Sequence, residues 1–417
     1  MGKILLGGIA DDFTGASDLA NNLVRTGMRV LLAIGVPVSA SSPNDVDAVV
    51  VALKSRTIAP QDAVAQSLAA LSWLQLKGAS QIYFKYCSTF DSTAQGNIGP
   101  VTDALMDALG TRFTIATPAF PDNKRTVFKG YLFTGDTLLN ESGMQNHPLT
   151  PMLDANLVRV LQAQTRRSVG LIDYSVVANG SVAIAQRVEE LKAAGVGIAI
   201  VDAISNDDLM RLGPALKGMA LVTAGSGVAI GLPQNFGIAP TADAGMLPIA
   251  GGLQAVVSGS CSLATNAQVL SFINTGLPAM AIDPLQIASG MEVVSQALAW
   301  AAPLLKAGPV LVYSTADSAA IQTVQSQLGV EKAGALVEHT LAAIAKGLVA
   351  LGVRQLIVAG GETSGACVQA LGITQMQIGP QIAPGVPWCH ANGIHISLKS
   401  GNFGGNDFFT DAFKMLA

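Results

Sequence analysis

Short apolar runs alternate with alanine-rich segments of helical character along the whole chain. The first half holds strand-like runs at residues 4–9, 48–53, 81–86, 112–117, 197–201 and 220–223. Segments of helical character lie between them, among them residues 62–76 and 182–194. Strands that alternate with helices predict an α/β fold, in which helices cover a mostly parallel sheet.

A stretch with little periodicity, rich in glycine, proline and alanine, interrupts this pattern at residues 231–252. The pattern restarts with a strand at 254–258 and continues with strands at 310–314, 355–359 and 394–399 and a helix at 342–351. Because 417 residues exceed one ordinary core, we predict two domains, residues 1–240 and 241–417. The expected fold class is α/β, with two domains, each a largely parallel sheet flanked by helices. The active site is expected in the interdomain cleft.

The composition excludes several classes of protein. Half of the residues are hydrophobic, only 12% are charged and the net charge is −4, which argues against a disordered or nucleic-acid-coating chain. No run of about 18 apolar residues lacks a charge, glycine or proline, and the N-terminal apolar run does not resemble a signal peptide. The four cysteines are isolated, without CxxC spacing, so reduced thiols in the cytoplasm are expected and zinc is not.

Two adjacent carboxylates, Asp11 and Asp12, follow the first predicted strand, and Thr14, Gly15 and Ser17 then begin a helix. Ligands of open α/β sheets bind beyond the carboxyl ends of the strands. Neighbouring carboxylates at that place are costly unless they bind cations, polyols or protons. We therefore predict that both are catalytic, with Asp12 as the base and Asp11 gripping hydroxyls. The alternative is one aspartate that caps the helix beside one that is solvated.

Cationic and polar residues follow three further predicted strands, and we predict that they bind an anionic, polyhydroxylated substrate. The candidates are Lys54, Ser55, Arg56, Lys85, Asp91 and Arg125. Arginine can bind a carboxylate through two parallel hydrogen bonds, so Arg56 and Lys85 are the candidates for the substrate's acid group. For each loop the alternative is a solvated turn. His147, in a loop with two prolines, is expected to be structural.

Three loops rich in glycine and serine follow strands of the second half, at residues 258–262, 359–367 and 398–407. Such loops present backbone N–H groups to a phosphate, and glycines allow its close approach. Three in one domain predict a nucleotide site that includes Gly401, although helix capping by Thr363 and Ser364 explains one loop equally well. The first loop is not a Walker A motif, and Gly225-Ser226-Gly227 does not complete a dinucleotide fingerprint.

A substrate domain followed by a nucleotide domain favours phosphoryl transfer, which depends on positioning and charge neutralisation. A carboxylate near the acceptor hydroxyl can then act as the base. A dehydrogenase is disfavoured because the dinucleotide fingerprint is missing. A non-catalytic, two-domain sugar-acid binding protein is the non-enzyme alternative.

Four motifs resemble those of the four-carbon acid sugar kinase family, in order and nearly end to end. They lie at residues 10–15, 91–99, 360–363 and 399–404. Residues 85–93 and the loop at 146–148 are similar to the branch that phosphorylates 3-oxo-tetronates. The resemblance implies an N-terminal sugar-acid substrate-binding domain, a C-terminal nucleotide-binding domain, and transfer of phosphate from ATP, with Mg²⁺, to the terminal O4 of a four-carbon 3-oxo sugar acid. It implies that ATP contacts Ser258, Gly360, Gly361, Glu362, Thr363 and Gly404.

The chain departs from the family pattern at two positions. Gln95 stands where a basic residue is usual before the Gly-Asn pair, and Lys124 stands where glycine usually precedes Arg-Thr. Both departures put individual substrate contacts in question, and both disfavour the threonate and erythronate branches. A kinase of threonate or erythronate stays the alternative function. The expected partners are a sugar acid and ATP, with no nucleic acid or membrane. A homodimer, the metal ligands and the preferred epimer stay open.

Overall fold

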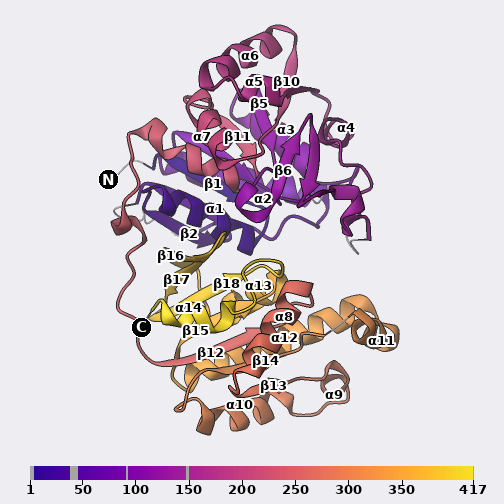
Figure 1. The fold of residues 1–417 in the computed structure, drawn as a ribbon, viewed down its shortest axis with the longest axis vertical. Coiled ribbons are helices and arrows are strands. Elements are labelled where there is room, and N and C mark those ends of the chain that lie inside the picture. The colour runs from indigo at the N-terminus through magenta and orange to yellow at the C-terminus, as the bar shows by residue number, and fades with distance from the viewer. Residues whose placement is uncertain (1–3, 38–45, 91–92, 147–149, 317, 417) are drawn as a thin grey trace. The chain divides into compact units, whose positions relative to one another are not determined.

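The structure, a computed structural model, describes residues 4–37, 46–90, 93–146, 150–316 and 318–416. The chain divides into two compact units, Met1–Gly245 and Met246–Ala417, where the sequence predicts a boundary between residues 240 and 241. Each unit contains a sheet that helices cover on both faces, as Figure 1 shows. The expected α/β class, with a largely parallel sheet in each part, is confirmed.

The main sheet of the first unit pairs its strands in parallel. Their order is β2 (Val30–Ile34), β3 (Ala48–Ala52), β1 (Leu6–Ala10), β4 (Gln81–Lys85), β11 (Leu221–Ala224), β5 (Thr114–Thr117), β10 (Val196–Val201) and β9 (Ser168–Ile172). Every residue of β1, β3 and β4 is buried, which explains why these strands read as continuous apolar runs. Parallel pairing brings the carboxyl ends of these three strands to one edge of the sheet.

Helices connect these strands and cover both faces. On one face lie α1 (Phe13–Arg25), α7 (Asn206–Ala215) and α6 (Ser181–Ala193), and on the other lie α2 (Pro60–Leu76), α3 (Ile98–Ala108) and α4 (Leu157–Gln162). The short α5 (Tyr174–Val177) precedes α6. A small antiparallel sheet of β6 (Arg125–Phe128), β7 (Tyr131–Thr134) and β8 (Thr137–Leu138) is inserted after β5.

The sheet of the second unit is parallel on one side and antiparallel on the other. Its order is β13 (Ala279–Ala281), β14 (Val310–Tyr313), β12 (Leu253–Ser258), β15 (Val353–Ala359), β18 (Ile394–Lys399), β17 (Val386–Ala391) and β16 (Gln375–Ala383). The first five strands run parallel, whereas β16, β17 and β18 pair antiparallel. The sequence does not predict β16 and β17, because Gly379, Pro380 and Pro387 interrupt them with residues typical of turns.

Helices of the second unit also lie on both faces of its sheet. One face carries α9 (Pro284–Ala288), α10 (Val293–Leu304), α11 (Ser318–Leu328), α12 (Val330–Ala350) and α13 (Gly361–Ala370), and the other carries α8 (Leu263–Asn274) and α14 (Phe408–Lys414). Trp388 is fully buried among Phe272, Phe409 and Phe413, and its Nε1 donates to Ala412 O at 2.9 Å. Among the described helices α12 alone is long and apolar enough to cross a membrane by length and composition, and it packs against β12, β15 and α13.

Lys124 adopts a left-handed backbone, with φ of 55° and ψ of 35°, in the turn that joins Pro121–Asn123 to β6. A side chain in this conformation is strained by about 1–2 kcal/mol relative to the right-handed region, whereas glycine adopts it freely. This strain gives a physical reason for the glycine that usually precedes Arg-Thr in the family pattern. The departure at Lys124 therefore falls on a backbone requirement of the turn.

Candidate active site

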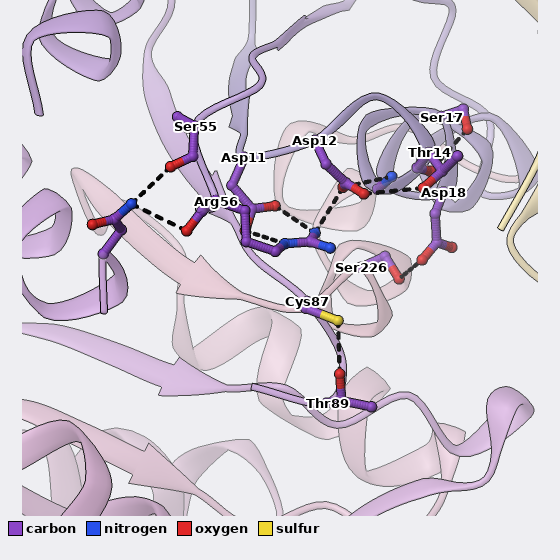
Figure 2. Close-up of polar contacts among 12 residues, drawn as sticks. Asp11, Asp12, Thr14, Ser17, Asp18, Ser55, Arg56, Cys87, Thr89 and Ser226 are labelled. Carbon is purple, nitrogen blue, oxygen red and sulfur yellow. Dashed lines mark hydrogen bonds and ion pairs between the residues drawn. The ribbon is translucent and has the colours of Figure 1, made fainter. Parts of the chain in front are cut away.

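Asp11, Asp12 and Arg56 form the centre of a polar cluster at the carboxyl ends of β1 and β3 (Figure 2). Arg56 binds Asp11 with two hydrogen bonds, from Nε to Oδ2 at 2.9 Å and from Nη2 to Oδ1 at 2.8 Å. The same Nη2 lies 2.8 Å from Asp12 Oδ1. One guanidinium therefore bridges both carboxylates and balances one of their two charges, and the charge of Lys85 also acts on Asp12. Together the two cations explain how adjacent aspartates are tolerated at this strand end.

Asp12 also begins the helix that follows. Its Oδ1 accepts the Gly15 N–H at 2.8 Å and its Oδ2 accepts the Thr14 hydroxyl at 3.0 Å, so Asp12 is the N-cap of α1. Burial raises the pKa of Asp12, but the charges of Arg56 and Lys85 and the bonds at the helix start outweigh burial and hold that pKa below its usual value. Asp12 is therefore ionised at neutral pH while about a quarter of its side chain stays exposed.

Lys85, the last residue of β4, lies beside this carboxylate and is buried. Within the described part of the chain its ammonium makes no hydrogen bond or ion pair, yet its charge lowers the pKa of both Asp12 and Asp18. A Cβ atom at Gly15 would collide with Lys85 Nζ and Asp12 Oδ1. The glycine of the Asp-Asp-Phe-Thr-Gly motif thus makes room for a lysine that is 70 residues away in the sequence.

Asp18 is a member of this cluster that the sequence does not predict. It lies on α1, only 3% exposed, and its Oδ2 accepts the Ser226 hydroxyl at 2.5 Å, whereas its Oδ1 has no partner among the described residues. Burial raises the pKa of Asp18 to about 7, although Lys85 and Ser226 act in the opposite direction. Ser17, Asn21 and Asn22 on the same helix are also fully buried. Their helical spacing predicts a solvated face, so the sequence gives no signal that this face is covered.

The protonation of Asp18 predicts a measurable dependence of stability on pH. Between about pH 4 and pH 7 the folded chain holds a proton on Asp18 that the unfolded chain has released, so this residue lowers the free energy of unfolding by about 1.4 kcal/mol per pH unit as the pH rises. Asp18→Asn removes this dependence. We therefore expect the variant to gain stability over the wild type by about 2–3 kcal/mol between pH 5 and pH 8 in urea unfolding. Identical pH dependence for the two proteins would contradict the assignment.

Asn97 holds the loop that carries Arg56. Its Nδ2 donates to the carbonyl oxygens of Ser55, Arg56 and Ile58, at 2.8, 3.1 and 3.0 Å. The Ser55 N–H in turn donates to Asp11 O at 2.9 Å. A small cavity in this region is lined by Asp11, Ser55, Arg56, Phe84, Cys87, Asn97, Ile98 and Val101. Asn97 is therefore a positioning residue, although the sequence singles it out only as part of a motif.

The other predicted substrate-binding residues differ in their surroundings. Lys54 is exposed just after β3, and Ser55 is buried beside Asp11. Arg125 begins β6 of the small sheet, where its Nη1 donates to Asn123 O at 2.9 Å. Asp91 and His147 lie outside the described residues. The structure thus brings Asp11, Asp12, Arg56 and Lys85 together.

In the second unit, three loops follow the neighbouring strands β12, β15 and β18. Parallel register places Ser258 beside Ala359 and Ala359 beside Lys399, so the three loops leave the sheet at one edge. Backbone bonds join their starts, from Gly259 N to Ala359 O at 2.9 Å and from Gly360 N to Lys399 O at 2.8 Å. The predicted nucleotide-binding residues fall at this edge: Ser258, Gly360, Gly361, Glu362, Thr363, Gly401 and Gly404.

Close packing between these loops requires glycine at two positions. Gly360 has a φ of +122°, and a Cβ there would lie 2.9 Å from Thr363 Oγ1 and 3.2 Å from Ser260 N. A Cβ at Gly401 would lie 2.6 Å from Ser260 Oγ. Gly360 is the N-cap of α13 and offers no side-chain cap, so the first N–H groups of that helix stay available to an anion.

Comparison with known proteins shows that each of the two units matches a different domain model. Residues 6–232 match the model of a sugar-binding N-terminal domain, and residues 255–409 match that of a nucleotide-binding C-terminal domain. The chain is thus a two-domain protein that joins a sugar-binding domain to a nucleotide-binding domain. The chain belongs to the four-carbon acid sugar kinase family.

Several relatives carry a more specific name. The chain is 58% identical to a 3-oxo-tetronate kinase of Burkholderia multivorans and 56% identical to one of Pseudomonas fluorescens, in both cases over 99% of this chain and 97% of the relative. A solved structure of a Haemophilus influenzae protein matches with a TM-score of 0.80 and 46% identity, over 99% of this chain and 100% of that one. The chain is thus similar to these kinases over its whole length.

Proposed function

We propose that the chain transfers the terminal phosphate of ATP to O4 of a four-carbon 3-oxo sugar acid, a 3-oxo-tetronate. The observation that carries the proposal is the similarity to 3-oxo-tetronate kinases, with 56–58% identity over 99% of this chain. The chain also matches both domain models, one for sugar binding and one for nucleotide binding. The strand-end cluster and the glycine loops supply the two binding chemistries that such a reaction needs. Phosphoryl transfer requires positioned groups and neutralised charge more than covalent catalysis.

In the first unit, Asp12 is the proposed base. Its low pKa keeps it ionised, so an oxygen can accept a hydrogen bond from the acceptor hydroxyl and orient that hydroxyl for attack. Asp11 is held more rigidly by two bonds from Arg56 and is proposed to bind a neighbouring hydroxyl. The bonds of Arg56 described above use Nε and Nη2, so Nη1 remains to bind the substrate's acid group. The buried ammonium of Lys85 is proposed to attract the same acid group.

The glycine loops of the second unit fit a nucleotide phosphate. Gly360 and Gly401 lie where a Cβ would fill the space between loops, and the uncapped start of α13 offers N–H groups. We assign ATP contacts to Ser258, Gly360, Gly361, Glu362, Thr363, Gly401 and Gly404. Bound ATP supplies the phosphoryl group, and these residues orient it through backbone N–H groups and hydroxyls.

The described residues contain no cluster of three or more histidine, cysteine or acidic side chains placed to hold a metal ion. Magnesium is commonly bound by one or two carboxylates together with substrate phosphates, and such an arrangement fits this edge. Glu362, exposed in the first turn of α13, is the proposed carboxylate.

We also propose a cytoplasmic location, because the enzyme uses ATP and its four cysteines form no disulfide.

A coupled assay of ADP release tests the substrate. The panel contains 3-oxo-tetronates of both epimers, threonate, erythronate and a five-carbon aldonate, each with ATP and Mg²⁺. We expect the largest kcat/KM for a 3-oxo-tetronate, with phosphate found on O4 by ³¹P and ¹³C NMR. A larger kcat/KM for threonate or erythronate would replace the proposed substrate. Binding of the acids without ADP release would support a binding protein.

Gly361→Val tests the nucleotide site. Gly361 is the exposed first residue of α13, so a branched side chain there would stand in the path of a phosphate while the helix can still form. We expect the KM for ATP to rise at least tenfold, about 1.4 kcal/mol, with little change in the KM for the sugar acid. Gly251→Val is the matched control, because Gly251 is exposed in the same unit with open space around it. An unchanged KM in a folded variant would move the nucleotide site elsewhere.

A further inference from the structure

Lys399, at the end of β18, is a fully buried cation that the assignments above do not use. Its Nζ donates to Gly401 O at 2.9 Å, to Ser400 O at 3.0 Å and to Thr265 Oγ1 at 3.1 Å. These three bonds use all the donors of an ammonium group. All three acceptors are neutral oxygens, so the positive charge itself is not balanced by them.

The described chain offers Lys399 no counter-charge. Of the acids on neighbouring segments, Glu362 is exposed at the start of α13, Asp407 accepts the Ser271 hydroxyl at 2.6 Å, and Asp411 pairs with Lys414. The thiols of Cys261 and Cys367 on these segments both have raised pKa values and stay neutral. Burial lowers the pKa of Lys399 to about 7, and no charged group offsets that effect. A buried ammonium without an anion is costly. A negatively charged ligand bound near Lys399 would supply the missing counter-charge.

The bonds of Lys399 also fix the direction of the loop that follows it. In a trans peptide the N–H points away from the C=O, and the described chain has no cis peptide. Because the carbonyls of Ser400 and Gly401 point toward Lys399, the N–H groups of Gly401 and Asn402 point to the opposite side. Neither N–H has an acceptor among the described residues.

Side chains of α8 and of the loop before it hold the rest of this segment in the same orientation. Ser262 Oγ and Thr265 Oγ1 donate to Gly401 O at 2.6 and 2.8 Å. Gln268 Nε2 donates to the carbonyls of Phe403, Gly404 and Gly405 at 3.0–3.1 Å. The bonded carbonyls of this segment thus face inward, and the Phe403 N–H stays within the loop, where it donates to Ser400 O at 3.2 Å. The N–H groups of Gly401 and Asn402 face the opposite side, and two successive outward N–H groups can form a backbone anion site.

We propose that Lys399 is a positioning residue for the nucleotide: its ammonium orients the N–H groups of Gly401 and Asn402 toward the phosphates and balances their charge from behind the loop, without touching them. The inference rests on the proposed function, because it takes ATP as the anion. It has a consequence that a purely structural lysine would not have. Phosphates bound in front of the loop favour the charged form of Lys399, so ATP binding above pH 7 takes up a proton.

Isothermal titration with MgATP, in two buffers of different ionisation enthalpy at pH 8, measures this uptake. At pH 8 phosphate oxygens are fully ionised, so we expect the wild type to take up roughly half to one proton per ATP. Lys399→Met should raise the Kd for ATP about tenfold, abolish the uptake and leave the KM for the sugar acid within about twofold. Lys414→Met, which removes an exposed lysine of the same unit, should match the wild type.

The possible outcomes separate this inference from the proposed function. Wild-type protein that binds ATP without proton uptake overturns the inference and leaves the kinase intact, and this result needs no variant to fold. A Lys399→Met protein with wild-type affinity and uptake overturns it as well. Failure of the wild type to bind ATP would overturn the proposed function and the inference together.

Discussion

Asp12→Asn should lower kcat by about 10²–10⁴, the usual loss when a positioned base is removed. Asparagine is as good an N-cap as aspartate, and its amide oxygen can still accept the Gly15 N–H, so α1 should form. The substitution removes the carboxylate that faces Arg56 and that can accept the proton of the acceptor hydroxyl. Steady-state kinetics with saturating ATP and sugar acid measure kcat, and a titration with ATP alone verifies that nucleotide binding persists.

Asp11→Asn is the matched variant for this experiment. Asp11 is more buried than Asp12 and receives both of its bonds from Arg56, so its loss should mainly raise the KM for the sugar acid. If Asp12→Asn keeps more than about a third of the wild-type kcat, Asp12 is not the base. The candidate would then be Asp91, which lies outside the described residues.

Arg56→Ala should lower kcat/KM for the sugar acid by at least about 10², while the KM for ATP stays within about twofold. The loss of a charge-assisted hydrogen bond costs about 1.5–3 kcal/mol, and here one guanidinium holds two carboxylates. Without Arg56 the pKa of Asp12 rises, because a major opposing charge is gone. Activity should therefore fall more at pH 5 than at pH 8, where Asp12 is still ionised.

Arg159→Ala is the control for loss of an arginine. Arg159 also binds an aspartate with two hydrogen bonds, both at 2.8 Å to Asp154, but this pair lies on the surface of the same unit. Surface pairs contribute about 0–1 kcal/mol, so its kinetics should equal those of the wild type. Equal losses for the sugar acid and for ATP in Arg56→Ala would assign Arg56 a structural role instead.

The sequence predicts most strands of the parallel sheets, because buried strands such as β1, β3 and β4 are uninterrupted apolar runs. The parallel strands β2, β9 and β13 are not among those predicted. The sequence also predicts which strand ends carry polar residues, since Asp11 and Arg56 each follow such a run. The antiparallel pair β16 and β17 escapes prediction, because glycine and proline occur within strands whose partners are set by tertiary contacts. The first part of α12 escapes as well, because Glu331, Lys332 and Glu338 dilute its apolar pattern.

The interior of the candidate site was harder to predict than its position. Sequence reasoning treats Arg56 as free to bind a substrate carboxylate, whereas in the structure its nearest carboxylates belong to the protein. Asp18 gives no signal because a polar helical face is normally solvated, and only the fold shows that Ser226 covers it. Lys399 appears in the sequence only as a lysine beside glycines, and its burial depends on β15, α8 and the loop after β18.

The three carbonyl bonds of Asn97 bear on the entropy of substrate binding. Asn97 stands at the N-terminus of α3 and makes no side-chain cap there, so its amide serves the Arg56 loop instead of its own helix. A loop that is already ordered does not lose conformational freedom when the sugar acid binds, and ordering a side chain at that moment would cost about 0.5–1.5 kcal/mol. The site therefore binds the sugar acid with a smaller loss of conformational entropy, because the Arg56 loop is ordered in advance. Replacements of Asn97 should alter substrate affinity through loop order rather than through a lost contact.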